Sequence, residues 1–109
     1  MKLVVIESPF AGDVEANVEY ARRALLDSLR RGEAPLASHL LYPQVLSDTD
    51  PDERRQGIEA GFAWNEHAGT VAVYADRGVS NGMRQGIEAA LDLGIAVEYR
   101  FLDDASPPA

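Results

Sequence analysis

Four short apolar runs divide the chain and predict the strands of a buried sheet. They occupy residues 2–7 (KLVVIE), 34–42 (APLASHLLY), 70–75 (TVAVYA) and 95–102 (IAVEYRFL). The first run shows no polar alternation, which is typical of a strand covered on both faces, as in a parallel sheet.

Helical periodicity fills the three intervals between these runs. The first helix is predicted to begin at the N-cap Asp13 and to end at Gly32. The second begins at Asp50, because the proline that follows it suits the first helical position. The third runs from the N-cap Ser80 to Gly94. The apolar face predicted for the first helix consists of Val14, Val18, Ala21, Leu25 and Leu29.

Strands and helices alternate, which predicts one α/β domain over residues 1–102 and a flexible tail over residues 103–109. We expect a Rossmann-like (flavodoxin-like), mainly parallel sheet of about four to five strands with helices on both faces. Ligands of such sheets bind at the carboxyl ends of the strands. The candidate site therefore lies in the loops at residues 8–13, 39–50 and 76–81.

The charge balance narrows the range of partners. Lys and Arg number 10 and Asp and Glu number 18, so the net charge is −8, which disfavours nucleic acid and anionic membranes. The absence of cysteine excludes disulfides, thiolate metal sites and cysteine nucleophiles. No paired histidine spacing indicates a metal, and no secretory signal begins the chain. We therefore predict a cytoplasmic protein that uses neither a metal nor a cofactor.

The first loop offers backbone amides at a helix N-terminus, where an anion can bind. However, Asp13 and Glu15 occupy the place that a phosphate would take, so a plain turn is the alternative interpretation. The candidate ligand-binding residues of this loop are Ser8, Pro9, Phe10 and Gly12.

The loop after the third apolar run favours a ligand more strongly. Ser80 can cap the following helix and still offer its hydroxyl and nearby amides to an anion. Asn81 and Gly82 are poor helix formers that a plain turn does not explain. The candidates here are Asp76, Ser80, Asn81, Gly82 and Met83.

His39 lies within or at the end of the second predicted strand. A lone histidine there is either a packed, hydrogen-bonded residue or a contributor to the site, and we include it among the candidates.

The hexapeptide RQGIEA occurs twice, at residues 55–60 and 84–89. Six residues do not establish a duplication. We expect Gly57 and Gly86 to let their helices approach the sheet closely.

Several segments, in their order along the chain, resemble the nucleoside 2-deoxyribosyltransferase-like superfamily. They are VVIESPFAG, Asn17, the run at residues 34–42, and VYADRGVSNGMRQGIEAALDLGIAVEYR. The resemblance spans residues 2–102 and is closest to small phage and bacterial members, related to 2′-deoxynucleoside 5′-monophosphate N-glycosidases. It implies a Rossmann-like sheet, a nucleoside or nucleotide ligand, and a homo-oligomer with pockets near subunit contacts. A phage-encoded member would lie in the host cytoplasm.

Active members use a glutamate that attacks the anomeric carbon and forms a glycosyl-enzyme intermediate. The resemblance places this glutamate six positions after the serine of an S-x-G turn, which Ser80 and Gly82 match and which holds the 5′-phosphate of monophosphate substrates. That position is Gly86. Ser8 matches the first-loop segment over the ligand, and Asp76 matches the acidic residue that often follows the third strand.

Because glycine cannot be a nucleophile, three interpretations remain open. The protein binds a nucleoside- or nucleotide-like molecule and sequesters it without turnover; or it is an N-glycosidase or deoxyribosyltransferase that uses Glu88, Asp76 or Glu7; or it inhibits a protein partner through its acidic surface. Glu88 lies about 200° around the helix from position 86, and the superfamily does not predict Glu7.

An oligomer of at least two chains would need an interface. The second helix offers one in the face that carries Gly57, Gly61, Phe62 and Trp64.

Overall fold

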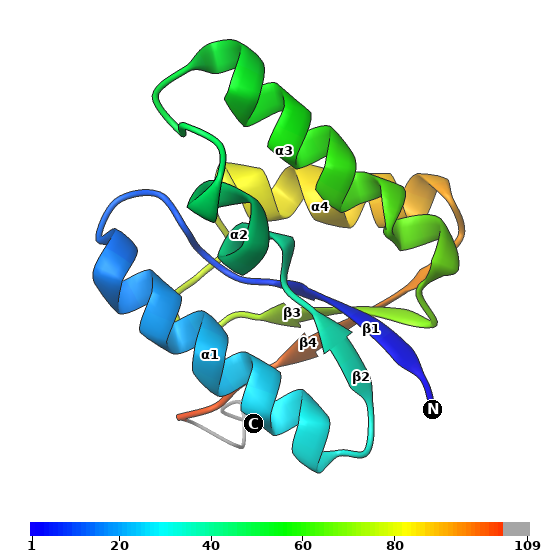
Figure 1. Ribbon diagram of the computed structural model, residues 1–109. Helices are drawn as coiled ribbons and strands as arrows, with labels where there is room; N and C mark the ends of the chain where they lie inside the picture. Colours follow the sequence, from blue (N-terminus) through cyan, green and yellow to red (C-terminus); the bar gives the residue numbers. More distant parts are fainter. Residues whose placement is uncertain (104–109) are drawn as a thin grey trace.

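The structure, a computed structural model, describes residues 1–103 and contains a four-stranded parallel sheet in the order β2-β1-β3-β4 (Figure 1). The strands are β1 (Leu3–Glu7), β2 (Ala34–Leu36), β3 (Thr70–Tyr74) and β4 (Ala96–Arg100). The helices are α1 (Val14–Arg30), α2 (Ser38–Leu41), η1 (Tyr42–Gln44), α3 (Pro51–Ala63), η2 (Asn65–His67) and α4 (Asn81–Asp92). The predicted α/β class with a parallel sheet is confirmed. Of the predicted tail, residues 104–109 lie outside the described residues.

Side chains that alternate along the strands build one core on each face of the sheet. Val4 and Ile6 of β1 join the core under α1, whereas Val5 joins the core under α4. Figure 1 shows α1 on one side of the sheet and α3 and α4 on the other. Since β1 alternates, Glu7 follows Val5 and points to the side of α4.

The buried face of α1 is rotated from the predicted one. Asn17 and Ser28 are buried, whereas the predicted core residue Leu29 is 57% exposed. Both buried polar side chains are hydrogen-bonded: the Ser28 hydroxyl donates to Glu33 Oε1 (2.8 Å), and Asn17 holds the first loop, as described below. The buried face thus combines apolar Tyr20, Ala21 and Ala24 with two hydrogen-bonded polar residues, which a search for apolar periodicity does not detect.

The second predicted strand ends early. β2 pairs with β1 only from Ala34 to Leu36, and residues 38–44 form two short helices instead of continuing the strand. The composition of the apolar run at residues 34–42 does not distinguish a strand from a helix, because short buried segments of either type have similar composition. Leu40 packs against the core under α1, and Pro43 lies in the first turn of η1. His39 therefore lies on a helix, not on a strand.

Within residues 1–103, no helix has both the length and the apolar character needed to cross a membrane.

Candidate functional site

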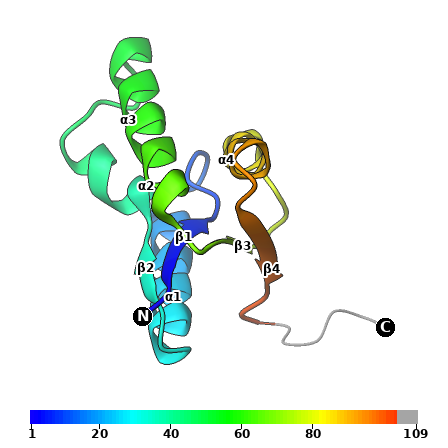
Figure 2. The same cartoon turned by 90° about the vertical axis from the view of Figure 1, so that its right-hand side faces the viewer.

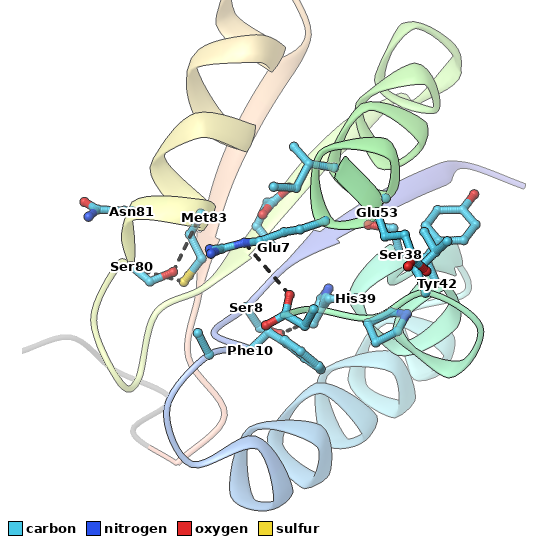
Figure 3. Close-up of a pocket in the computed structure, with 18 of the residues that line it drawn as sticks. Glu7, Ser8, Phe10, Ser38, His39, Tyr42, Glu53, Ser80, Asn81 and Met83 are labelled. Atoms are coloured by element: carbon cyan, nitrogen blue, oxygen red, sulfur yellow. Dashed lines mark hydrogen bonds and ion pairs between the residues drawn. The ribbon is translucent and has the colours of Figure 1, made fainter. Parts of the chain in front are cut away.

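A cavity of about 410 Å³ opens at the carboxyl end of the sheet (Figure 3). The loops that leave the neighbouring strands β1 and β3 run to opposite faces, and this switch point is where open α/β sheets bind ligands. The end of β1, the first loop, residues 38–58 and the first turn of α4 supply the lining. Figure 2 shows the first loop rising between α3 and α4.

Glu7, the last residue of β1, brings a carboxyl group into this cavity (Figure 3). Burial raises its pKa from 4.5 to about 8, since desolvation disfavours the charged form. Among residues 1–103 no hydrogen bond or ion pair offsets that cost. The carboxyl group of the free protein is therefore protonated at neutral pH.

Gly86 of α4 makes room for this carboxyl group. A Cβ atom at position 86 would lie 2.2 Å from Glu7 Oε2 and 2.9 Å from Oε1, which is closer than such atoms approach. Helix α4 has no side chain at position 86, and the carboxyl group of Glu7 from β1 occupies that space. Gly86 thus permits a close approach, as predicted, and what approaches is the side chain of Glu7.

Ser8 and His39 form a polar pair near Glu7 in the cavity lining. Ser8 Oγ lies 2.6 Å from His39 Nε2, and Ser8 is buried. Burial lowers the pKa of His39 to about 4, so its imidazole is neutral at pH 7. The pair joins the end of β1 to α2 without adding charge to the site.

Hydrogen bonds from α1 hold the first loop, residues 8–13, in place. Asn17 Nδ2 donates to the carbonyl oxygens of Phe10 and Ala11, both at 3.0 Å. Asp13 caps the helix by accepting from the Ala16 amide (3.2 Å). The N-terminus of α1 is thereby taken by its own carboxylate, which favours the plain-turn interpretation of its amides over a phosphate site.

The N-terminus of α4 differs, because its first turn carries no acidic residue. Ser80 Oγ accepts from the Met83 amide (3.3 Å) and the Ser80 amide donates to Met83 Sδ (3.4 Å). Asn81 and Gly82 line the cavity beside them. A helix N-terminus without an acid can accept a negative group.

The structure brings together seven of the predicted ligand residues in the cavity lining: Ser8, Phe10, His39, Ser80, Asn81, Gly82 and Met83. Pro9, Gly12 and Asp76 lie outside it.

The two carboxylates predicted for catalysis also lie outside the lining. Glu88 is exposed on α4. Asp76 accepts hydrogen bonds from the Tyr20 hydroxyl (2.5 Å) and from the amides of Leu102 (2.8 Å) and Asp103 (2.9 Å), so it fastens the chain after β4 to β3. These surroundings give no support to a catalytic role for either residue.

The crossover between β2 and β3 supplies further lining. Five of these residues lie in the predicted loop at residues 39–50: Tyr42, Pro43, Leu46, Ser47 and Asp48. The sequence did not indicate the four that α3 supplies: Glu53, Arg54, Gly57 and Ile58. Arg54 Nε lies 3.9 Å from Asp48 Oδ1, and both residues line the cavity.

The α3 glycines pack within the chain. A Cβ at position 57 would meet Leu46 at 3.3 Å, and one at position 61 would meet Ser38 Oγ at 2.6 Å. Gly57 therefore approaches the crossover, not the sheet as predicted. The helix face predicted for subunit contact is in large part used inside the subunit.

Comparison with known proteins identifies a family model that matches the chain and solved structures with a similar fold. A family model described as "Domain of unknown function (DUF7768)" matches residues 2–100. Similar solved structures include a 2-deoxyribosyltransferase from Bacillus psychrosaccharolyticus (TM-score 0.67, 15% identity, 96% of this chain and 77% of that one). A CMP N-glycosidase from Clostridium botulinum, BcmB, is similar with a TM-score of 0.52 at 12% identity, over 95% of this chain and 92% of the other.

A third similar structure is the 2-deoxyribosyltransferase from Leishmania mexicana, with a TM-score of 0.53 and 18% identity, over 94% of this chain and 66% of that one. No curated protein sequence matches the chain. The likenesses establish that the fold is shared with deoxyribosyltransferases and an N-glycosidase.

Proposed function

The chain belongs to the DUF7768 family, and we propose that it binds a nucleoside- or nucleotide-like small molecule in the cavity at the end of β1. The observation that carries the proposal is the position of this cavity at the switch point of a sheet whose fold is shared with nucleoside-processing enzymes.

The size and lining of the cavity support such a ligand. A volume of about 410 Å³ falls within the range of small-molecule sites, roughly 300–1,000 Å³. Phe10 offers aromatic surface against which a planar base can stack. Ser8, His39 and Ser80 offer polar atoms for sugar hydroxyls, so the lining combines apolar surface with few polar groups, as small-molecule sites do.

The charges limit how many phosphates the ligand carries. Among the described residues that line the cavity, Arg54 is the one side chain that is cationic at neutral pH, and it is paired with Asp48. Glu53 adds a negative charge, whereas Glu7 stays protonated. The lining therefore carries a net negative charge and offers no free cation to a polyphosphate. The first turn of α4 offers one place for an anion, so the proposed ligand carries either no phosphate or one.

The glycine at position 86 does not by itself imply a site without turnover. That interpretation rested on a missing carboxylate, and Glu7 now supplies a carboxyl group beside the same glycine. Binding and turnover are therefore separate questions, and the experiment below addresses binding alone. Assembly into a homo-oligomer and a cytoplasmic location remain predictions.

The test is a binding panel of nucleosides, their 5′-monophosphates and their triphosphates, followed by calorimetry on the purified chain. We expect saturable binding of nucleosides or monophosphates and none of triphosphates. In Asn81→Asp, the new carboxylate at the start of α4 should weaken monophosphates and leave nucleosides unchanged. Gln56→Glu, on an exposed part of α3 outside the cavity, adds the same negative charge there and is the matched control. Failure of every nucleoside and monophosphate to bind would contradict the proposal.

A further inference from the structure

Building on the nucleoside site proposed above, we propose that Glu7 is a catalytic residue, which donates a proton to the base of a bound nucleoside while water hydrolyses the N-glycosidic bond.

The first support is the fit between strand and helix. The Glu7 carboxyl group lies against the α4 backbone at Gly86, in space that even a methyl group at position 86 would occupy. An apolar side chain at position 7 could fill the same space without the cost of burying a carboxyl group. Packing alone therefore does not explain a glutamate at this position, whereas chemistry in the adjoining cavity does.

The second support is the absence of a counter-charge. Within residues 1–103, the other titratable side chains that line the cavity are His39, Tyr42, Asp48, Glu53 and Arg54. Burial keeps the His39 imidazole neutral, and Arg54 pairs with Asp48. Glu53 accepts from the Ser47 amide (3.0 Å). No cation holds Glu7 in its ionised form, so the acid form is the one that meets the ligand.

A raised carboxyl pKa suits this role. Burial brings the pKa of Glu7 to about 8, and a carboxylic acid kept neutral at working pH can act as a general acid toward a leaving group. An ionised carboxylate, which a nucleophile requires, is the minor form at neutral pH in the same surroundings. The surroundings of Glu7 therefore favour proton donation over covalent attack.

The reaction needs no component other than water. The Glu7 O–H gives its proton to a ring nitrogen of the base, while the bond between that base and C1′ of the sugar breaks and its electron pair stays with the base. A water oxygen forms a new bond to C1′ and passes one proton to the Glu7 carboxylate. The products are the free base and the free sugar, and the acid form of Glu7 is restored.

The test compares wild type with Glu7→Gln, which keeps the shape of the side chain and cannot donate an acid proton. Release of free base is followed by chromatography with purine and pyrimidine nucleosides and monophosphates, and binding of the intact ligands is followed by calorimetry. We expect release to fall about 100-fold or more in the variant, the range for loss of a general acid, while binding persists. Release by wild type should decline as pH rises above about 8.

The outcomes separate the two proposals. Binding without release of base by wild type overturns the catalytic role and leaves the binding site standing. Release that Glu7→Gln does not reduce, or a sugar covalently attached to Glu7 in mass spectra, overturns the acid role as well. If no nucleoside or monophosphate binds at all, both proposals fail. Glu59→Gln serves as the control for the same substitution at an exposed glutamate outside the cavity.

Discussion

A buried glutamate, Glu33, and a partly buried one, Glu7, have opposite electrostatic surroundings. Glu33, just before β2, accepts from both terminal guanidinium nitrogens of Arg100 (2.7 and 2.8 Å) and from the Ser28 hydroxyl (2.8 Å). The hydrogen bonds from Arg100 lower its pKa. Glu7 has no such partner among residues 1–103, and burial raises its pKa to about 8. The carboxyl group of Glu33 is therefore ionised at neutral pH, whereas that of Glu7 is protonated.

The difference separates a structural role from a functional one. Glu33 and Arg100 lie away from the cavity and neutralise each other, so their burial is consistent with holding α1, β2 and β4 together. Among residues 1–103 Glu7 has no counter-charge, and it lies at the end of the sheet where the cavity opens. A buried group that costs stability and faces a cavity is a candidate for chemistry.

The largest expected effect comes from breaking the Glu33 pair. Arg100→Met leaves the Glu33 carboxylate without its counter-charge, so we expect the free energy of unfolding at pH 7 to fall by about 4 kcal/mol. Urea denaturation measures this. Glu33→Leu combined with Arg100→Met should recover most of the loss, because no buried charge then remains. A single-variant loss below about 1 kcal/mol would show that the pair is not structural.

The pH dependence of stability sharpens the same contrast. The folded state raises the pKa of Glu7, so below the ordinary value near 4.5 both states are protonated and nothing is lost. As the pH rises, the unfolded chain ionises and the folded chain does not, until about pH 8. Between about pH 5 and 8 the Glu7 side chain should therefore reduce the free energy of unfolding by about 3 kcal/mol.

Glu7→Gln should remove this decline, which denaturation of both proteins at several pH values would detect. Glu33 acts with the opposite sign: its lowered pKa adds stability above the ordinary value, and that stability is lost as the pH falls. If the free energy of unfolding changed with pH in the same way in wild type and in Glu7→Gln, the claim that Glu7 is uncharged at neutral pH would be refuted.

A smaller effect tests the contact between Glu7 and Gly86. Gly86→Ala forces the Glu7 carboxyl group, the flexible end of its side chain, to move from the helix, so we expect a loss of about 1 kcal/mol despite the better helix propensity of alanine. In a Glu7→Gly background the same substitution should instead stabilise by up to about 1 kcal/mol.

Thermal unfolding of the four proteins gives the coupling free energy between the two positions. Gly82→Ala is the control on the same helix, since a Cβ there meets only Ser80 Oγ at 4.0 Å. Additive effects of the two substitutions would mean that Glu7 does not lie against Gly86.

Much of the fold could be predicted because its signals are local. Apolar runs located β1 and β3, and the N-caps Asp13, Asp50 and Ser80 begin α1, α3 and α4 as predicted. The short β2 could not be predicted, since its end is set by pairing with β1 and by packing of Leu40, not by composition.

The place of the candidate site followed from the alternation of strands and helices, but its central contact did not. The carboxyl ends of the strands were expected to hold the ligand, and Ser8, His39 and Ser80 do line the cavity. That Glu7 lies against Gly86 depends on how β1 and α4 pack together, which spacing within either segment does not reveal. One local signal was available: the apolar run KLVVIE ends in a charged residue, directly after Val4, Val5 and Ile6.

The most direct measurement is a titration of the glutamate side-chain carboxyl groups by ¹³C NMR in the ligand-free protein, with Glu7→Gln and Glu33→Gln used to assign the two signals. The account predicts that Glu7 titrates near pH 8 while Glu33 titrates below the ordinary range. Addition of a nucleoside that binds in the cavity should shift the Glu7 signal and leave the Glu33 signal in place. A Glu7 carboxyl group that titrates near pH 4.5, as an exposed glutamate does, would contradict the account.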